Sequence, residues 1–130
     1  MIADTSFLID IMRKNDSAIQ KEEALESEGV PLSITAVSVF ELYIGFGLST
    51  KQVLERKKIE LVLENLLVFP LNLEAAKEAG EIYADKRRRG SAIDPEDAMI
   101  AGICKVNHEV ILTRNVNHFS GIDGLSVESY

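Results

Sequence analysis

Short apolar runs alternate along the chain with longer segments in which apolar residues recur every three or four positions. The short runs predict strands at Met1–Asp4, Val30–Ile34, Leu67–Leu71, Glu109–Thr113 and Leu125–Glu128. The longer segments predict helices near residues 5–12, 17–28, 35–48, 50–66, 72–89 and 95–106. Strands that alternate with helices indicate an α/β fold, a three-layer α/β/α sandwich around a short central parallel sheet.

Polar residues at the ends of these segments match the preferences of helix termini. Thr5 or Ser6 is predicted to cap the first helix and Asn72 the fifth, while Gly90 follows the fifth helix where positive φ is common. Pro70 places the third strand near a sheet edge or a strand end. No repeat or linker interrupts the chain, so we expect one domain over residues 1–130.

Three carboxylates stand where the apolar pattern calls for interior residues. Glu41 shares a helical face with apolar residues four positions before it and three and seven after it, and Asp97 shares one with residues three, four and seven positions on. Asp4 directly follows the first strand, where it is also a candidate N-cap. The pattern thus directs a carboxylate inward from each of three separate elements.

Composition narrows the classes of function. The 21 acidic and 14 basic residues give a net charge of −7, which argues against a general nucleic-acid coating protein. A single cysteine and two histidines leave no intrachain disulfide and too few ligands for a structural zinc site. No apolar run approaches the roughly 18 residues of a membrane span, so we expect a cytoplasmic protein without a membrane segment.

The inward carboxylates point to a bound cation. The lysines and arginines gather at residues 51–58 and 86–89, away from the faces that carry Glu41 and Asp97. Two carboxylates ~4 Å apart repel by about 4 kcal/mol at an effective dielectric near 20. Oxygen ligands alone select a hard divalent ion, Mg²⁺ or Mn²⁺, which points to phosphodiester chemistry.

Simpler structural roles compete for each acid. Asp94 precedes Pro95 and is either the N-cap of the last long helix or a fourth acid of the site. Asp97 could form a capping box with Asp94, and Glu41 could be a buried glutamate that a tyrosine such as Tyr43 or Tyr83 satisfies.

Other functions for the whole chain compete as well. A receiver-type phosphoacceptor domain would carry its key acids after strands, and a phosphatase with an aspartate nucleophile would want a second aspartate where Ser6 stands. A metal-free interaction module would pair the same acids with arginines of a partner protein.

Four segments in order along the chain carry these acids and the residues near them: MIADTSFLIDIM, SITAVSVFELYIG, GSAIDPEDAMIAGIC and ILTRNVNHF. In these segments the chain resembles the PIN-domain nucleases, and more closely the VapC toxins of VapBC toxin–antitoxin pairs. The resemblance implies metal-binding acids at Asp4, Glu41 and Asp97, with Asp94 close by. It also implies cleavage of RNA, a homodimer and a cognate VapB-like antitoxin. The chain departs from many members at Asn115, where they carry an aspartate.

Candidate substrate contacts surround these acids. Four polar residues are candidates to hydrogen-bond the acids or the scissile phosphate, although the hydroxyls could equally be ordinary caps: Thr5, Ser6, Thr113 and Asn115. Since an acidic pocket repels RNA, cations at its rim should hold phosphates. Arg13, Lys14 and the basic run Lys86–Arg89, which includes Arg87 and Arg88, are candidates. The rival role of that run is to complement the helix dipole.

Overall fold

Five short strands form one parallel sheet in the order β3-β2-β1-β4-β5. In this computed structural model, which describes all residues 1–130, the strands are β1 (Ile2–Ala3), β2 (Ser33–Thr35), β3 (Leu67–Phe69), β4 (Ile111–Leu112) and β5 (Val127–Glu128). The helices are α1 (Thr5–Met12), α2 (Asp16–Ser27), α3 (Ala36–Leu48), α4 (Gln52–Leu63), α5 (Leu73–Arg88), α6 (Pro95–Val106) and α7 (Val116–Phe119). The sheet order differs from the 2-1-3-4-5 order of receiver-type domains, which disfavours that alternative.

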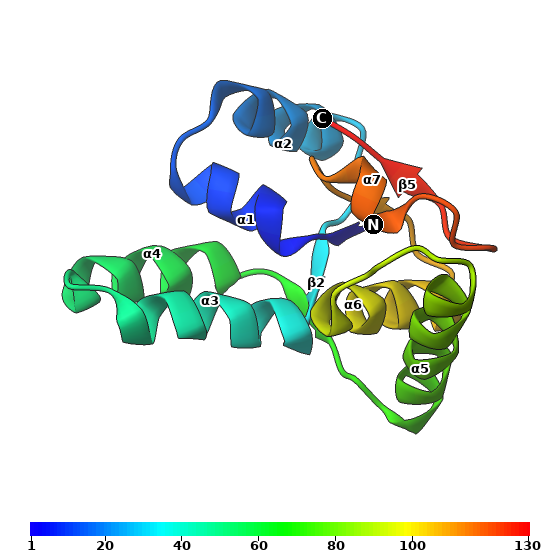
Figure 1. The fold of residues 1–130 in the computed structure, drawn as a ribbon. Coiled ribbons are helices and arrows are strands. Elements are labelled where there is room, and N and C mark those ends of the chain that lie inside the picture. Colours follow the sequence, from blue (N-terminus) through cyan, green and yellow to red (C-terminus); the bar gives the residue numbers. More distant parts are fainter.

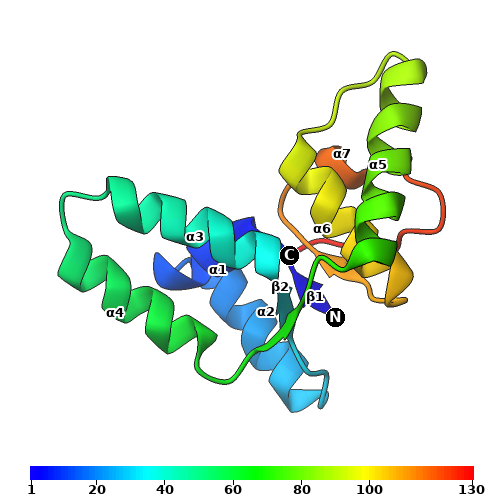
Figure 2. The ribbon, with the colours of Figure 1, turned by 90° about the horizontal axis from the view of Figure 1, so that it is seen from below.

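Helices cover both faces of this sheet (Figures 1 and 2). Successive residues of a strand face opposite ways: Ile2 and Ile111 join the apolar cluster with α5 and α6, whereas Ala3 and Leu112 join the cluster with α1, α2 and α4. Helix α3 contributes to both clusters through Val37 and Leu42. The expected α/β/α sandwich with a central parallel sheet is confirmed.

Helices α5 and α6 pack unusually closely, and Figure 2 shows them side by side. A Cβ atom at Gly102 would lie 2.7 Å from the Ala75 carbonyl oxygen and 2.8 Å from the Ala79 backbone nitrogen. Only a residue without a side chain fits there, because both neighbours are backbone atoms. This contact fixes α6, the helix that carries Asp97, against the rest of the fold.

Several predicted helix ends are confirmed by their hydrogen bonds. Thr35 accepts from the Ser38 backbone nitrogen at 3.0 Å, and Asn72 accepts from that of Ala75 at 2.9 Å. Gly90 has φ of +75° just beyond α5. The cap predicted for the first helix is wrong, because Asp4 occupies the N-cap position and Thr5 is already helical.

Some strands begin or end at other residues than predicted, because their pairing with neighbouring strands sets their ends. The strand predicted at Val30–Ile34 lies at Ser33–Thr35, where the chain pairs with β1 and β3. Strand β4 is shorter than Glu109–Thr113 because its neighbour β1 offers only two residues. Strand β3 is an edge strand and ends before Pro70, as expected. No pattern predicted α7, and no helix combines the length and the hydropathy needed to cross a membrane.

Candidate active site

The central strands deliver polar residues to one end of the sheet. Asp4 follows β1, Thr113 follows β4, and Thr35 ends β2 and leads into α3. The carboxyl ends of parallel strands meet at the same edge, where α/β proteins bind their ligands. The sequence therefore brings together residues that lie more than a hundred positions apart.

Asp4 is held by hydroxyl groups. It is only 4% exposed, and its Oδ2 accepts hydrogen bonds from Ser6 Oγ and Thr113 Oγ1, both at 2.8 Å. The backbone of α1 donates nothing to this side chain, so Asp4 is not an ordinary side-chain cap. Both donors approach Oδ2, which leaves Oδ1 without a hydrogen bond. Buried carboxylates normally have a cation partner or lose their charge, so this arrangement is exceptional.

Glu41 approaches the same place from α3. The Thr5 hydroxyl donates to Glu41 Oε1 at 2.7 Å and lies 2.9 Å from Ser38 Oγ. Burial raises the pKa of Glu41 most, the Thr5 hydrogen bond opposes it, and the charges of Asp4 and Asp97 raise it further. The partner is thus a threonine from α1 and neither of the tyrosines proposed from the sequence.

Asp97 lies on the first turn of α6, where His118 contacts it. The distance from His118 Nδ1 to Asp97 Oδ2 is 3.1 Å. Burial raises the pKa of Asp97 most and the charge of Asp4 adds to it, whereas His118 lowers it. Asp94 is exposed at the N-cap position but makes no side-chain cap hydrogen bond, so the capping box with Asp97 does not form. Its charge instead raises the pKa of Asp97.

The four predicted acids therefore share one electrostatic environment. Asp4 raises the pKa of both Glu41 and Asp97, and the charge of Asp97 also raises the pKa of Glu41. No three side chains among His, Cys, Asp and Glu stand close enough together to form a ready-made metal site. The donor set itself fits a hard divalent ion, because it consists of carboxylates and leaves Asp4 Oδ1 free for a ligand.

A small open cavity of about 150 Å³ lies beside Asp97. Its lining includes Asp94, Asp97, Asn117 and His118. Asn115, a candidate substrate contact, lies two positions before Asn117 and is half-buried. Its backbone nitrogen donates a hydrogen bond to Thr113 Oγ1 at 2.9 Å. Asn115 thereby fixes the hydroxyl that holds Asp4, through its backbone.

Comparison with known proteins now identifies the family. The family model described as "PIN domain" matches residues 1–125. The chain belongs to the PIN domain family. A relative from Shigella flexneri, named tRNA(fMet)-specific endonuclease VapC, is 30% identical over 119 residues, which are 90% of this chain and 88% of the relative. Within the PIN family the chain is of the VapC type, as the four motifs indicated, and nuclease is its class of activity.

Solved structures agree with this fold. The VapBC2 structure from Rickettsia felis, bound to a DNA fragment from its promoter, has a TM-score of 0.91 at 21% identity and is matched over 99% of this chain and 97% of that one. DNA-bound VapBC from Salmonella typhimurium has a TM-score of 0.89 at 26% identity, over 98% and 96% of the two chains.

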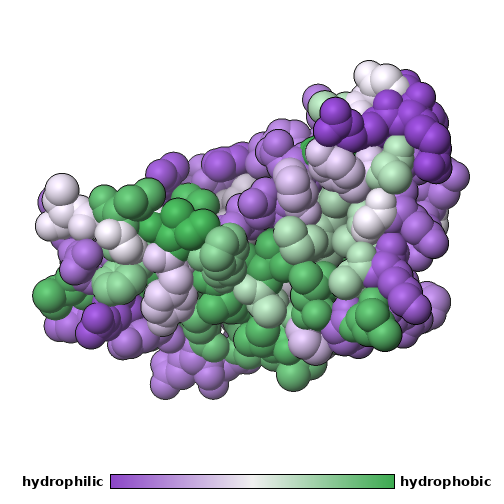
Figure 3. Space-filling model, turned by 60° about the horizontal axis from the view of Figure 1, so that its bottom comes forward, coloured by the Kyte–Doolittle hydropathy of each residue, from purple (hydrophilic) through white to green (hydrophobic).

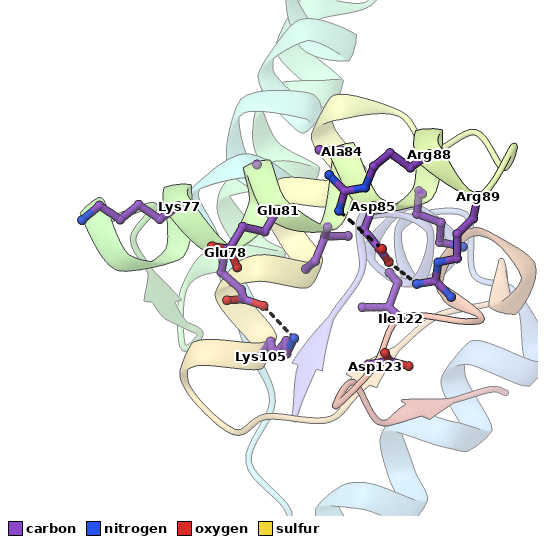
Figure 4. A pocket seen from close by; sticks show the side chains of 13 residues that line it. Lys77, Glu78, Glu81, Ala84, Asp85, Arg88, Arg89, Lys105, Ile122 and Asp123 are labelled. Atoms are coloured by element: carbon purple, nitrogen blue, oxygen red, sulfur yellow. Dashed lines mark hydrogen bonds and ion pairs between the residues drawn. The ribbon is translucent and has the colours of Figure 1, made fainter.

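The basic run of this PIN domain is occupied by contacts within the protein. Arg87 donates to the Tyr83 hydroxyl at 2.9 Å and lies over its ring, while Arg88 and Arg89 both pair with Asp85. Figure 4 shows Asp85 between these two arginines, on the wall of a cavity of about 730 Å³ that contains none of the four acids. Phosphate binding by Arg87 and Arg88 stays a prediction.

Several residues around the four predicted acids were missed by the sequence analysis. His118 and Glu96 both lie within the segments that resemble PIN domains, yet their spacing gave no sign that His118 affects Asp97 or that Glu96 affects Glu41. Asp10 was missed as well: it is 4% exposed and accepts from Arg114 Nη1 and the Tyr130 hydroxyl, both at 2.6 Å. Asp10 lies one turn beyond Ser6, a spacing that could have placed it on the same helix face.

Proposed function

We propose that this chain is a metal-dependent endoribonuclease and the toxin of a toxin–antitoxin pair. The observation that carries the proposal is Asp4, a buried carboxylate that hydroxyl groups hold in place, with the charges of Glu41 and Asp97 acting on the same site. RNA as substrate is supported by the name of the Shigella flexneri relative, which is a tRNA-specific endonuclease.

Asp4, Glu41 and Asp97 would hold Mg²⁺ or Mn²⁺, with Asp94 close to them. A divalent ion at such a site polarises a phosphate and lowers the pKa of water. Hydrolysis adds water to the phosphorus and releases the 3′ oxygen, which leaves a 5′-phosphate and a 3′-hydroxyl. None of the four carboxylates needs to act as the nucleophile.

The surrounding residues orient these carboxylates. Ser6 and Thr113 restrain Asp4 through Oδ2 and keep Oδ1 available. Thr5 fixes the direction of Glu41 from a different helix, and His118 contacts Asp97 from α7. Groups held in this way lose little conformational freedom when they bind an ion or a substrate.

Metal removal tests the proposed activity. Purified protein with Mn²⁺ should degrade bulk cellular RNA, and excess EDTA should stop the reaction. Added Mn²⁺ should restore it, which controls for damage by the chelator. Cleavage that continues in EDTA would contradict the proposal, and a protein that neither cleaves RNA nor binds Mn²⁺ would be the metal-free interaction module instead.

An exposed apolar face supports partners for this nuclease. Phe40, Ile44 and Leu48 on α3 and Leu54 on α4 are all exposed, Leu48 by 82%. Figure 3 shows hydrophobic side chains gathered across this face. We propose that a second copy of the chain and a cognate antitoxin cover apolar surface here, because monomers rarely expose so much of it. Both structural relatives described above are named VapBC, and the solved structure of VapBC-5 from Mycobacterium tuberculosis is described as a member of the VapBC family of toxin–antitoxin systems.

The partner proposals have simple tests. Sedimentation should show a dimer for the isolated protein, and Leu48→Glu should convert it to a monomer. A small DNA-binding protein encoded just upstream should form a complex with the chain and inhibit RNA cleavage. We propose the cytoplasm as the place of action, because RNA substrates are found there. A monomer that no neighbouring gene product inhibits would contradict the assembly.

A further inference from the structure

Arg114 is an arginine next in sequence to the residues that hold Asp4 in place. It stands between Thr113, which holds Asp4, and Asn115, which fixes Thr113. Its side chain is 45% exposed, and one of its nitrogens, Nη1, contacts Asp10. A guanidinium presents several N–H donors in a planar fork, so most of the donors of Arg114 remain available.

The carboxylate beneath Arg114 is fully occupied and hidden. Asp10 Oδ1 accepts from Arg114 and Oδ2 accepts from the Tyr130 hydroxyl, and the residue is only 4% exposed. The Tyr130 ring is fixed in turn by an edge-to-face contact with Phe7, at 4.9 Å between ring centres. An approaching anion would therefore meet the guanidinium and not the carboxylate that anchors it.

The same cluster adjoins the acidic site. Ser6, which donates to Asp4, lies one turn from Asp10 on α1 and affects the pKa of Tyr130. Burial is the main reason that the pKa of Tyr130 is raised, and the hydrogen bond to Asp10 is the next. Tyr130 therefore stays a hydrogen-bond donor at neutral pH, so it keeps Asp10 in place.

We propose that Arg114 binds a phosphate of the RNA strand beside the acidic site, and that Asp10 and Tyr130 position it. The proposal rests on the proposed ribonuclease function and supplies the cation that an acidic pocket needs for a polyanionic substrate. Arg88 and Arg89 suit this role less well, because they line the cavity on α5 whose walls contain none of the four acids.

A charge-neutral double variant tests this assignment. Asp10→Asn combined with Arg114→Gln leaves the net charge at −7 and strands no buried charge. Binding of polyuridylate is measured in EDTA, without cleavage, over a range of salt concentrations. We expect binding weaker by about tenfold. The slope of log affinity against log salt should fall by about 0.7, the value for one lost single-strand phosphate contact.

An ion pair between α5 and α6 provides a matched control. Glu78 and Lys105 also form a pair at 2.6 Å, on the cavity shown in Figure 4, and Glu78→Gln with Lys105→Gln removes it without a change in net charge. This control should bind polyuridylate like the unmodified protein. Equal affinity and slope for the two double variants would overturn the proposal, as would the absence of any salt-dependent binding by the unmodified protein.

Further measurements distinguish a loss of RNA binding from unfolding of the variant and from failure of the proposed ribonuclease function. Circular dichroism and thermal melting establish that the double variant folds; if it does not, Arg114→Lys keeps a cation for Asp10 but loses the planar fork, and it should bind several-fold more weakly. Binding that falls in the double variant while the unmodified protein cleaves no RNA with Mn²⁺ would refute the ribonuclease function alone. If the unmodified protein cleaves RNA and the double variant binds polyuridylate as tightly as the unmodified protein does, only the role of Arg114 is refuted.

Discussion

Two groups of carboxylates on this molecule have opposite surroundings. Along α5, Asp85 pairs with Arg88 and Arg89, and Glu78 pairs with Lys105 of α6 (Figure 4). In the candidate active site, Asp4 and Glu41 have hydroxyl donors and no lysine or arginine. Arg89 lowers the pKa of Asp85, whereas burial raises the pKa values of Glu41 and Asp97.

Under the proposed function, this difference separates structural acids from functional ones. A paired surface carboxylate contributes modestly to stability and is already neutralised. Grouped carboxylates without lysine or arginine destabilise the fold and persist where binding uses their charge. Asp10 shows that burial alone does not decide the matter, because it is as buried as Asp4 but is neutralised by Arg114.

The largest contrast should come from removing one charge from each group. Asp4→Asn should reduce RNA cleavage by about a hundredfold or more, because it removes charge from the reacting site while its amide oxygen can still accept from Ser6. Its melting temperature should be unchanged or higher, since a repulsion is relieved. Asp85→Asn should leave cleavage unchanged. If Asp4→Asn does not fold, Asp4 has a structural role. If Asp4→Asn and Asp85→Asn cleave RNA at equal rates, the two groups of carboxylates do not differ in function.

A smaller effect should follow from removing a hydroxyl donor. Thr113→Val keeps the shape of the side chain but removes its hydrogen bond to Asp4 Oδ2. Cleavage should fall by about tenfold, because a hydrogen bond to a charged group contributes about 1.5 kcal/mol. Thr50→Val, at an exposed position outside the site, is the control. Initial rates with saturating Mn²⁺ measure both, and equal rates would mean that Asp4 needs no such restraint.

The smallest effect should appear in the pH dependence of stability. Raised pKa values mean that Glu41 and Asp97 contribute stability that is complete below their ordinary values of 4.5 and 3.8 and is lost as the pH rises through the raised values. The lowered pKa of Asp85 acts in reverse, so its contribution is lost as the pH falls below 3.8.

Thermal melting of the metal-free protein measures this dependence. As the pH rises above 4.5, Glu41→Gln should show a smaller fall in melting temperature than the unmodified protein. Glu128→Gln, which removes a partly exposed acid that pairs with Lys21, is the control. Parallel curves for Glu41→Gln and the unmodified protein would show that Glu41 is not destabilised by its neighbours.

Local pattern predicted the elements and the helix faces on which acids lie, because both depend on periodicity. The positions of Glu41 and Asp97 followed from helical spacing, and Asn72 and Gly90 marked the ends of α5 as expected. These features need only a few neighbouring residues. The fold class and the parallel sheet followed from the order of the elements, whereas the edge position of β3 followed from Pro70.

The details that failed depend on contacts between distant segments. Thr5 looks like a cap in sequence but hydrogen-bonds Glu41, 36 positions away. The contacts of Asp97 with His118 and of Asp10 with Tyr130 join segments that only the folded chain brings together. Helix α7 is a single turn and is too short to give a periodic signal. Local spacing therefore identified which acids face inward, whereas their partners required the structure.

Calorimetric titration of Mn²⁺ into the metal-free protein tests most directly whether the acids of the active site capture a cation. We predict saturable binding to the unmodified protein, retained in Asp85→Asn and abolished in both Asp4→Asn and Asp97→Asn. Absence of binding, or binding that survives both substitutions in the active site, would contradict the account.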